Sequence, residues 1–283
     1  MRGEGLTADS SYVRSLGLFI GVHRRLSAVS FLLLLMFAGG PAPAAEPQRP
    51  QPLKSGGEFS SSELRALQAD DFGNPGMLWV VRGEKLWGEA AGRNGKSCAA
   101  CHGDARQSMK GVATHYPKVD PGAARLVNLE GRVNLCRERH QGAEPLQYES
   151  EELLGLTAYV AHQSRGMPVN VTIDLQNRKS YERGRDFYYA RRGQMNLSCS
   201  HCHDRNWGGR LLGETISQGH GNAYPIYRLE WQTAGSLHRR FRSCLFGVRA
   251  ELLPGGSQEL LDLEFYLAWR AGGLPVETPG VRR

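Results

Sequence analysis

The segments Cys98-Ala-Ala-Cys101-His102 and Cys199-Ser-His-Cys202-His203 decide the fold of this 283-residue chain. Each is a CxxCH pentapeptide, the attachment signal for c-type haem: its two thiols bond the haem vinyl groups and its histidine becomes an axial iron ligand. The two copies begin 101 residues apart. The sequence therefore predicts two covalently bound haem c groups, with the four motif cysteines as attachment points and with His102 and His203 as proximal ligands.

The two remaining cysteines each follow one pentapeptide. Cys136 lies 35 residues after Cys101, and Cys244 lies 42 residues after Cys202. Cytochrome c domains usually present a methionine to the far side of the iron, but here each corresponding loop carries a cysteine. We predict Cys136 and Cys244 as distal ligands, with His140 as the alternative at the first iron. Five other candidates have no counterpart at the matching place in the other copy: Met109, His115, Met167, His220 and His238. A Cys136–Cys244 disulfide is the remaining alternative, since an exported protein permits one.

An internal repeat predicts the fold class. Residues 150–169 align without gaps on residues 257–276, with ten of twenty positions identical. Each copy has a serine at the N-cap position, an apolar stripe at helical spacing and a glycine that ends the helix. The chain is expected to be mainly α, with two tandem class I cytochrome c domains: 76–170, which carries the first haem, and 171–283, which carries the second haem and the active site. An N-terminal extension, 46–75, precedes them and contains a short helix near 62–68.

The N-terminus has the pattern of an export signal. Arg24 and Arg25 precede an apolar run from Phe31 to Ala38, and small residues follow up to Ala45. The run is shorter than the roughly 20 residues that a bilayer-spanning helix needs. We therefore expect residues 1–45 to be a signal peptide and the mature protein to be periplasmic, without a membrane span.

The positive charge does not indicate a nucleic-acid partner. The formal net charge is +7, and removing residues 1–45, with four arginines against two acidic residues, leaves +5. Four haem propionates would lower the net charge further, to about +1. The remaining basic residues are clustered, and a local cluster of this kind attracts anions and acidic partners.

Arg240 lies four residues before Cys244, so in a helix the guanidinium and the sulfur share one face. A planar, bidentate donor beside a thiolate suits an oxyanion such as thiosulfate, and neighbouring cations favour the thiolate form. We therefore predict Cys244 and Arg240 as catalytic residues. The alternative is that Arg240 and its neighbours Arg239 and Arg242 only neutralise haem propionates.

Taken together, these residues resemble a known family. The paired CxxCH motifs, the lone cysteines, the stretch from Asn206 to Gln232 and the segment Arg240-Phe-Arg-Ser-Cys244 are similar to SoxA, the dihaem subunit of the SoxAX cytochromes of bacterial sulfur oxidation. The resemblance covers nearly the whole expected mature chain. It implies L-cysteine S-thiosulfotransferase activity, in which thiosulfate is joined oxidatively to a cysteine of the SoxYZ carrier and the partner is the monohaem cytochrome SoxX.

The resemblance also implies residue roles. Cys244 would be the active-site cysteine, present as a persulfide in the family, and Arg240 would bind the substrate. Two rival functions remain at this point. A thiosulfate dehydrogenase that forms tetrathionate would be expected to pair one cysteine-ligated haem with one methionine-ligated haem. A plain dihaem electron carrier would need methionine at both distal loops, and neither loop has one.

Overall fold

The structure is a computed structural model that describes residues 49–283. The predicted signal peptide, 1–45, lies outside the described residues. No helix among the described residues has the length and apolar character needed to cross a bilayer. We refer to residues 76–170 as the first half and to residues 171–283 as the second half.

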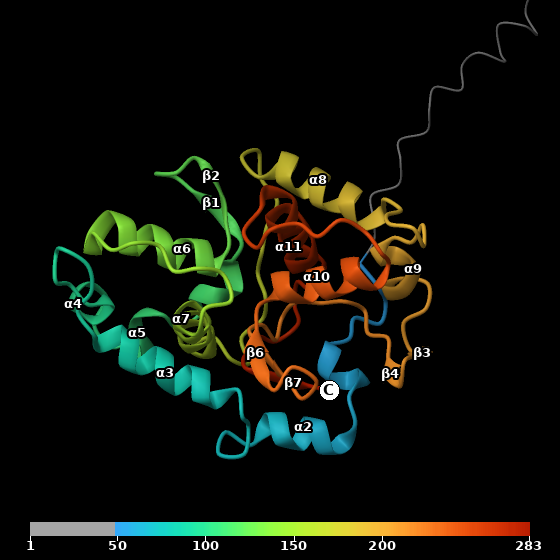
Figure 1. Cartoon of the computed structure of the whole chain (residues 1–283), viewed down its shortest axis with the longest axis horizontal. Helices are drawn as coiled ribbons and strands as arrows, with labels where there is room; N and C mark the ends of the chain where they lie inside the picture. The colour runs from blue at the N-terminus through green and yellow to red at the C-terminus, as the bar shows by residue number, and fades with distance from the viewer. Residues whose placement is uncertain (1–48) are drawn as a thin grey trace, which may run out of the picture. The chain divides into compact units, whose positions relative to one another are not determined.

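The described residues are mainly helical, as the sequence predicts (Figure 1). The helices are, in chain order, η1 (Gly56–Phe59), α2 (Ser62–Ala69), α3 (Met77–Gly88), α4 (Cys98–His102), α5 (Ala105–Ser108), η2 (Val112–His115), α6 (Leu129–Cys136), η3 (Arg137–Gln141), α7 (Glu151–His162), α8 (Arg178–Tyr189), α9 (Cys199–His203), α10 (Leu237–Gly247) and α11 (Gln258–Arg270). Of these, η1 and η2 are 3-10 helices and η3 is a π-helix.

The strands are short and form small sheets. They are β1 (Lys118–Asp120), β2 (Arg125–Val127), β3 (Arg210–Leu211), β4 (Glu214–Thr215), β5 (Ile226–Arg228), β6 (Thr233–Gly235) and β7 (Gly280–Arg282). The pairs β1–β2 and β3–β4 are antiparallel, whereas β5 lies between antiparallel β6 and parallel β7.

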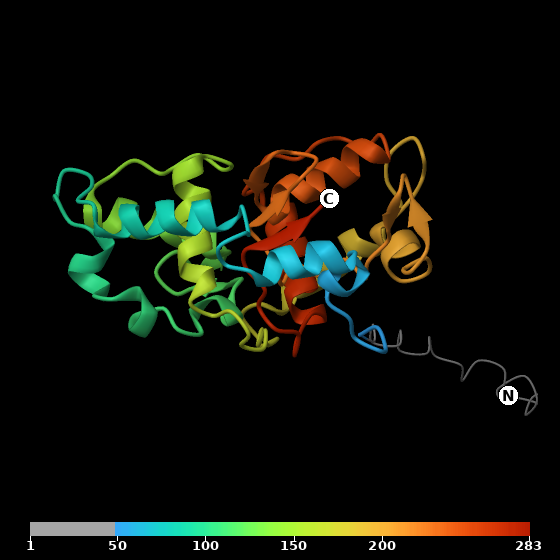
Figure 2. The same ribbon diagram turned by 90° about the horizontal axis from the view of Figure 1, so that it is seen from below.

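Each half is built on one pair of packed helices, α3 with α7 and α8 with α11. Figure 2 shows the two groups side by side, the first half in teal and green and the second in yellow to red. A glycine permits each close crossing. A Cβ added to Gly83 would lie 2.0 Å from the Gly155 carbonyl oxygen, and one added to Gly184 would lie 1.9 Å from the Asp262 carbonyl oxygen.

The two closing helices predicted from the repeat are confirmed as α7 and α11. Ser150 caps α7, its hydroxyl accepting a hydrogen bond from the Leu153 amide at 3.3 Å. Ser257 occupies the same position before α11, but its buried hydroxyl has no hydrogen-bond partner. Gly166 and Gly273 follow the helices with φ values of 81° and 96°, as the sequence predicts for their ends.

The segments that follow these two helices pair with each other. The Gly166 amide donates to Val276 O at 2.8 Å and the Gly273 amide donates to Val169 O at 3.0 Å. The two halves also share apolar contacts, because Val169 packs in the same core cluster as Leu260 and Tyr266 of α11. The halves are therefore joined directly, and their division into separate domains stays a prediction.

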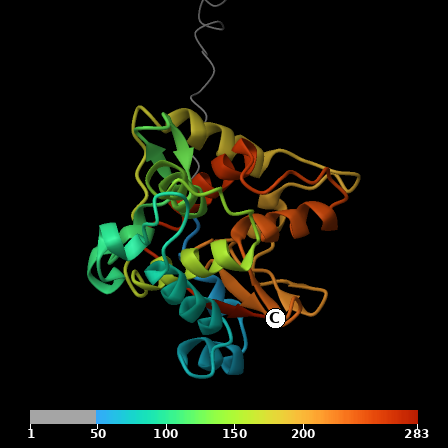
Figure 3. The same cartoon turned by 60° about the vertical axis from the view of Figure 1, so that its left-hand side comes forward.

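The segment before the first half packs on the second half. The short helix expected near 62–68 is confirmed as α2, and both α2 and η1 contact β7 (Figure 3). Gln68 accepts a hydrogen bond from the Val281 amide at 3.0 Å, which ties α2 to the last strand. The segment thus covers one edge of the small sheet that contains β5.

Candidate haem-binding and catalytic site

The first CxxCH motif forms a single turn of helix. Ser97 caps α4, its hydroxyl accepting a hydrogen bond from the Ala100 amide at 3.0 Å. The lone cysteine of this half, Cys136, is the last residue of α6. Burial raises the pKa of Cys98, and the charge of Cys136 raises it further. The pKa of Cys136 is raised as well, chiefly by burial and to a small extent by the charge of Cys101. The structure therefore brings these three sulfurs together.

The second motif repeats this arrangement. Its helix, α9, contains Cys199, Cys202 and His203, and Cys244 lies in the last half of α10. Burial raises the pKa of Cys199 to about 12, and the charge of Cys244 is the next contribution. Burial and then Cys244 also raise the pKa of Cys202. The second lone cysteine thus faces its own pair of motif sulfurs.

His203 is held in a fixed orientation. Its Nδ1 atom lies 2.8 Å from the Ser217 carbonyl oxygen, so the ring donates there and leaves Nε2 for another partner. A backbone carbonyl on the second ring nitrogen is the usual way to orient a metal-ligating histidine. Gly219 lies against the ring: a Cβ added to it would be 2.8 Å from His203 Cγ. The loop that contains Ser217 and Gly219 therefore fixes the orientation of the His203 ring, as the predicted ligand role requires.

Cys244 is an acidic thiol at the centre of the second site. Burial by itself would raise its pKa, but a hydrogen bond with His203 and the positive charge of Arg240 lower it to about 7. Many atoms surround this sulfur, yet the residue remains accessible to solvent. A side chain that lines an open space within the fold is expected to be surrounded by protein atoms and still be accessible to solvent. A large fraction of the sulfur is therefore in the thiolate form near neutral pH.

Arg240 lies one helical turn before Cys244, as predicted. Both belong to α10, which begins at Leu237 after the cap residue Ser236. The pKa of Arg240 is raised, and the charge of Cys244 is the largest cause. The predicted catalytic pair is thus one cation and one anion on the same helix face.

The residues present fit covalent haem c. None of the six cysteines, all of which lie within the described residues, is in a disulfide, so the Cys136–Cys244 alternative is not formed. In each half a pair of thiols, a histidine and a facing cysteine would supply the two attachment points and the two axial donors of one haem. In the second half the two candidate donors, His203 and Cys244, lie within hydrogen-bonding reach of each other, and His203 Nδ1 is bonded to the Ser217 carbonyl oxygen.

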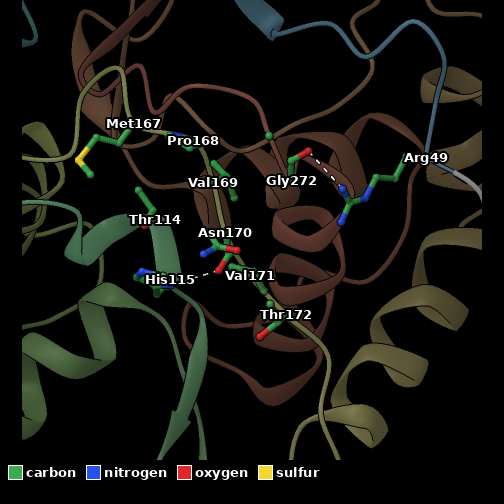
Figure 4. A pocket seen from close by; sticks show the side chains of 11 residues that line it. Arg49, Thr114, His115, Met167, Pro168, Val169, Asn170, Val171, Thr172 and Gly272 are labelled. Atoms are coloured by element: carbon green, nitrogen blue, oxygen red, sulfur yellow. Dashed lines mark hydrogen bonds between the residues drawn. The ribbon is translucent and has the colours of Figure 1, made fainter.

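The competing ligand candidates occupy several different places in the fold. His140 is exposed on η3. His115 and Met167 line a cavity of about 490 Å³ whose lining contains none of the cysteines (Figure 4). The ring of His115 is bonded to the Asn170 carbonyl oxygen at 3.1 Å. Met109 packs in the core cluster that also contains Cys98. His220 is bonded to Gln218 at 3.2 Å, and burial lowers its pKa to about 3.

The segment that follows the lone cysteine is one residue longer in the first half than in the second half. The loop before each motif bonds the turn behind that cysteine: the Asn94 amide donates to Gln141 O at 3.0 Å, and the Met195 amide donates to Val248 O at 3.3 Å. Gln141 is five residues after its cysteine, whereas Val248 is four residues after its own. The π-helix η3 takes up the extra residue, as such bulges do.

Sequence reasoning missed two groups of functional interest. Arg228 of β5 is only 6% exposed, its Nε has no hydrogen-bond partner, and its charge contributes to the lowered pKa of Cys244. Arg239 packs over the Trp231 ring at 4.3 Å, and Arg228 contacts the same ring at 5.2 Å. The second group, Arg270 with Asp204, supports the residue that follows His203. No spacing pattern in the sequence marks either group.

Comparison with known proteins agrees with this site. The sequence model of the SoxA/TsdA cytochrome c domain matches residues 82–169. The L-cysteine S-thiosulfotransferase subunit SoxA of Pseudaminobacter salicylatoxidans is 44% identical over 230 residues, which cover 81% of this chain and 80% of the relative. The subunit of the same name from Rhodovulum sulfidophilum is 38% identical over 242 residues, covering 86% and 84% of the two chains.

A solved structure gives the same result. The crystal structure of SoxXA from P. pantotrophus matches with a TM-score of 0.79 and 38% sequence identity, covering 82% of this chain and 87% of that chain. The identities and the coverage are high enough to establish the relationship. The chain belongs to the SoxA family of L-cysteine S-thiosulfotransferase subunits.

Proposed function

We propose that this chain is the thiosulfate-conjugating subunit of a periplasmic SoxAX cytochrome. It links thiosulfate to a cysteine of the SoxYZ carrier and works as a heterodimer with the monohaem cytochrome SoxX. It carries two haem c groups in two tandem cytochrome c domains, 76–170 and 171–283, which follow a signal peptide, 1–45, and an N-terminal extension, 46–75. The matched pairs α3–α7 and α8–α11 and the two sets of clustered sulfurs support the two-domain, two-haem assignment.

The observation that carries this proposal is the pairing of Arg240 with Cys244. The sulfur is held near neutral pKa inside the fold and remains accessible, while the guanidinium lies one turn away. Arg240 can donate two parallel hydrogen bonds to the sulfonate oxygens of thiosulfate. The outer sulfur of the bound anion then faces the Cys244 sulfur.

The chemistry proceeds in two balanced steps. In the first, the Cys244 thiolate and the outer sulfur of thiosulfate form a sulfur–sulfur bond, and two electrons leave. In the second, the thiolate of the SoxYZ cysteine attacks the sulfur that originates from thiosulfate. A new disulfide-type bond to the carrier forms, and the bond to Cys244 breaks, which restores its thiolate.

When haem is bound, it would accept the two electrons released in the first step. His102 and Cys136 would hold the first iron, and His203 and Cys244 would hold the second. The other residues of the site act on the substrate and on the thiolate. Arg240 orients the anion, and the charges of Arg240 and Arg228 keep the sulfur ionised.

Two variants and one control test the proposal. Cys244→Met should retain both haems but lose thiosulfate conjugation, because a thioether cannot form the sulfur–sulfur bond. Arg240→Lys keeps the charge and loses the bidentate geometry, so kcat/KM for thiosulfate should fall by about 10-fold to 100-fold, the equivalent of about 1–3 kcal/mol. Arg242→Lys, an exposed change on the same helix, should have little effect.

The measurement is thiosulfate-dependent cytochrome reduction with SoxX and SoxYZ present. Near-normal turnover by Cys244→Met would rule out the covalent step and leave the chain an electron carrier. Tetrathionate formation without SoxYZ would instead favour a thiosulfate dehydrogenase.

A further inference from the structure

The loop that orients His203 is itself held by a segment from the start of the described chain. Ser217 accepts the hydrogen bond of the His203 ring, and Gly219 lies against the same ring. Gln218, the residue between them, is 0% exposed. A buried side-chain amide needs hydrogen-bond partners for both its oxygen and its nitrogen. The partners of Gln218 therefore show what holds the loop in place.

The Gln218 amide bonds the backbone of the segment that precedes α2. Its nitrogen donates to the Pro52 carbonyl oxygen at 2.8 Å, and its oxygen accepts a hydrogen bond from the Lys54 amide at 2.9 Å. His220 Nε2 lies 3.2 Å from the same oxygen. Only one orientation of the amide satisfies both backbone groups, because a carbonyl accepts and an N–H donates. We call residues 52–59 the strap.

The backbone of Gln218 is held from another direction. Its carbonyl oxygen accepts a hydrogen bond from the Arg270 guanidinium of α11. The residue is therefore fixed at two points, by α11 through its main chain and by the strap through its side chain. Any movement of Gln218 also moves its neighbours Ser217 and Gly219, which are the residues that contact the His203 ring.

Ser55 of the strap binds the far end of the same loop. Its hydroxyl donates to Glu277, and Asn222 Nδ2 lies 3.5 Å from that hydroxyl oxygen. The Asn222 carbonyl oxygen accepts a hydrogen bond from the Glu277 amide at 2.8 Å. Ser55 is 4% exposed and Asn222 is 7% exposed. Buried polar contacts thus join the strap to the loop at a second place.

The strap also contacts the chain that leaves the second motif. Phe59 meets the Trp207 ring edge to face, with centroids 6.1 Å apart and an interplanar angle of 79°. Lys54 Nζ lies 6.0 Å from the centroid of the same ring. Trp207 is four residues after His203. The strap therefore contacts both segments that surround this histidine in the fold.

The first half supports its histidine with residues of its own. The His102 ring lies beside the Trp87 ring, with centroids 5.7 Å apart, and Trp87 Nε1 donates to the Gly103 carbonyl oxygen at 2.9 Å. Trp87 belongs to α3, which is part of the same half. The support of His203 differs because it includes a segment from outside its half.

We propose that Gln218 is a positioning residue for His203, and that the strap, by bonding Gln218, maintains the hydrogen bond from His203 Nδ1 to the Ser217 carbonyl oxygen. Such a bond raises the basicity of the ring nitrogen that is left to bind a metal. A more basic imidazole stabilises ferric iron, and hydrogen bonding around the ligands is one way in which a protein sets the potential of haem. The strap therefore lowers the reduction potential of the second haem. This inference rests on the proposed role of His203 as a proximal ligand.

Gln218→Leu tests the proposal in the haem-loaded protein, because it keeps a side chain of similar size and removes both hydrogen bonds to the strap. Potentiometric titration should show an upward shift of the second haem potential and no change in the first. The first haem is the one whose potential Cys136→Met alters. Ser55→Ala, a milder change within the strap, should shift the same potential upward by a smaller amount. Unchanged potentials in both variants would overturn the proposal.

Gln68→Leu is the matched control. Gln68 also ties the segment before the first half to the second half, but its side chain bonds β7 and Glu277 rather than the loop around Gln218. It should leave both potentials unchanged. A shift as large as that of Gln218→Leu would show that any loosening of this segment has the same effect, and would refute the specific role of Gln218.

The outcome for the strap is separate from the outcome for the proposed function, because none of these titrations uses thiosulfate. An upward shift in Gln218→Leu, with no thiosulfate turnover by wild type in the presence of SoxX and SoxYZ, would support the strap and refute the conjugating function. Normal turnover by wild type, with both potentials unchanged in Gln218→Leu and Ser55→Ala, would refute the strap and leave the function in place.

Discussion

The buried Arg270 forms an ion pair with Asp204, a partly exposed residue that directly follows the histidine of the second CxxCH motif. The same guanidinium lies 3.4 Å from the His203 carbonyl oxygen, and the Tyr188 hydroxyl donates to Asp204 at 2.8 Å. In the first half the position that matches Arg270 is Gln163, whose side chain donates to the Tyr159 carbonyl oxygen at 2.9 Å. An ion pair therefore contacts the backbone behind His203, whereas Gln163 at the matching position of the first half makes only a hydrogen bond within its own helix.

Replacing Arg270 with Gln should reduce the free energy of unfolding by less than the roughly 3–5 kcal/mol that breaking a fully buried ion pair costs, because Asp204 is 27% exposed and water can solvate the carboxylate that is left. Chemical denaturation of the haem-loaded protein measures this loss. The control is Arg82→Gln, which breaks a pair with Glu152 whose side chains are 44% and 40% exposed, and which should cost less than about 1 kcal/mol. Equal effects of the two changes would contradict the supporting role of Arg270.

A second prediction concerns the glycines that allow paired helices to pack closely where they cross. Gly184→Ala should destabilise the protein by several kcal/mol, because the added Cβ would lie 1.9 Å from the Asp262 carbonyl oxygen and would force α8 away from α11. Gly88→Ala, at the end of α3 where no atom lies within 4 Å of the added carbon, should be neutral or slightly stabilising. Thermal unfolding of both variants checks the contrast. A stable Gly184→Ala protein would mean that the helices can separate at low cost.

Ligation of the first haem can be tested by substitution. Cys136→Met should raise the reduction potential of the first haem, because a thioether favours ferrous iron and a thiolate favours ferric iron. It should leave the second haem unchanged. Low-spin EPR signals of the oxidised protein, before and after substitution, report the change. His140→Ala is the control and should alter neither signal, since His140 is exposed; loss of the first signal in that variant would transfer the ligand role to His140.

The number of haems follows from the two motifs and can be counted by mass. Denatured wild-type protein should retain two covalent haems and begin near residue 45 or 46. Replacing both Cys98 and Cys101 with Ala should remove one haem and leave the second, because each pair of thiols is the attachment point of its own haem. Intact-mass spectrometry gives the count directly. A single haem in the wild-type protein would exclude attachment at the first motif.

Local patterns in the sequence predicted much of this structure. The closing helices, the cap at Ser150, the short helix α2 and the helical placement of Arg240 relative to Cys244 are all confirmed. Each depends on residues within a few positions of one another, where helix periodicity and capping preferences act. The capping preference did not predict the hydrogen bonding of Ser257, which occupies the N-cap position of α11 but makes no cap hydrogen bond.

The remaining features depend on residues that are far apart in the chain. An arginine in the last turn of a helix normally indicates a solvated cation, but Arg270 is 2% exposed because Asp204 lies beside it in the folded protein. The contacts that Glu264 makes with Asn128 and His238 have the same origin, since the three residues come from distant segments of the chain. The extra residue in the π-helix after Cys136 can be recognised only by comparing the two halves in space, because the sequence repeat does not extend through that loop. Haem number, signal cleavage and the domain boundary stay predictions.

The pairing between the two halves has an approximate twofold symmetry. The hydrogen bond from the Gly166 amide to Val276 O corresponds to the bond from the Gly273 amide to Val169 O. In the same way, the bond from the Val169 amide to Leu274 O corresponds to the bond from the Val276 amide to Met167 O. Exchanging the two repeats maps each bond onto the other. Such self-complementary contacts are typical of the interface of a symmetric dimer. A single half has the groups to form the same four bonds with a second copy of itself, so this junction has the geometry of a symmetric dimer interface held within one chain.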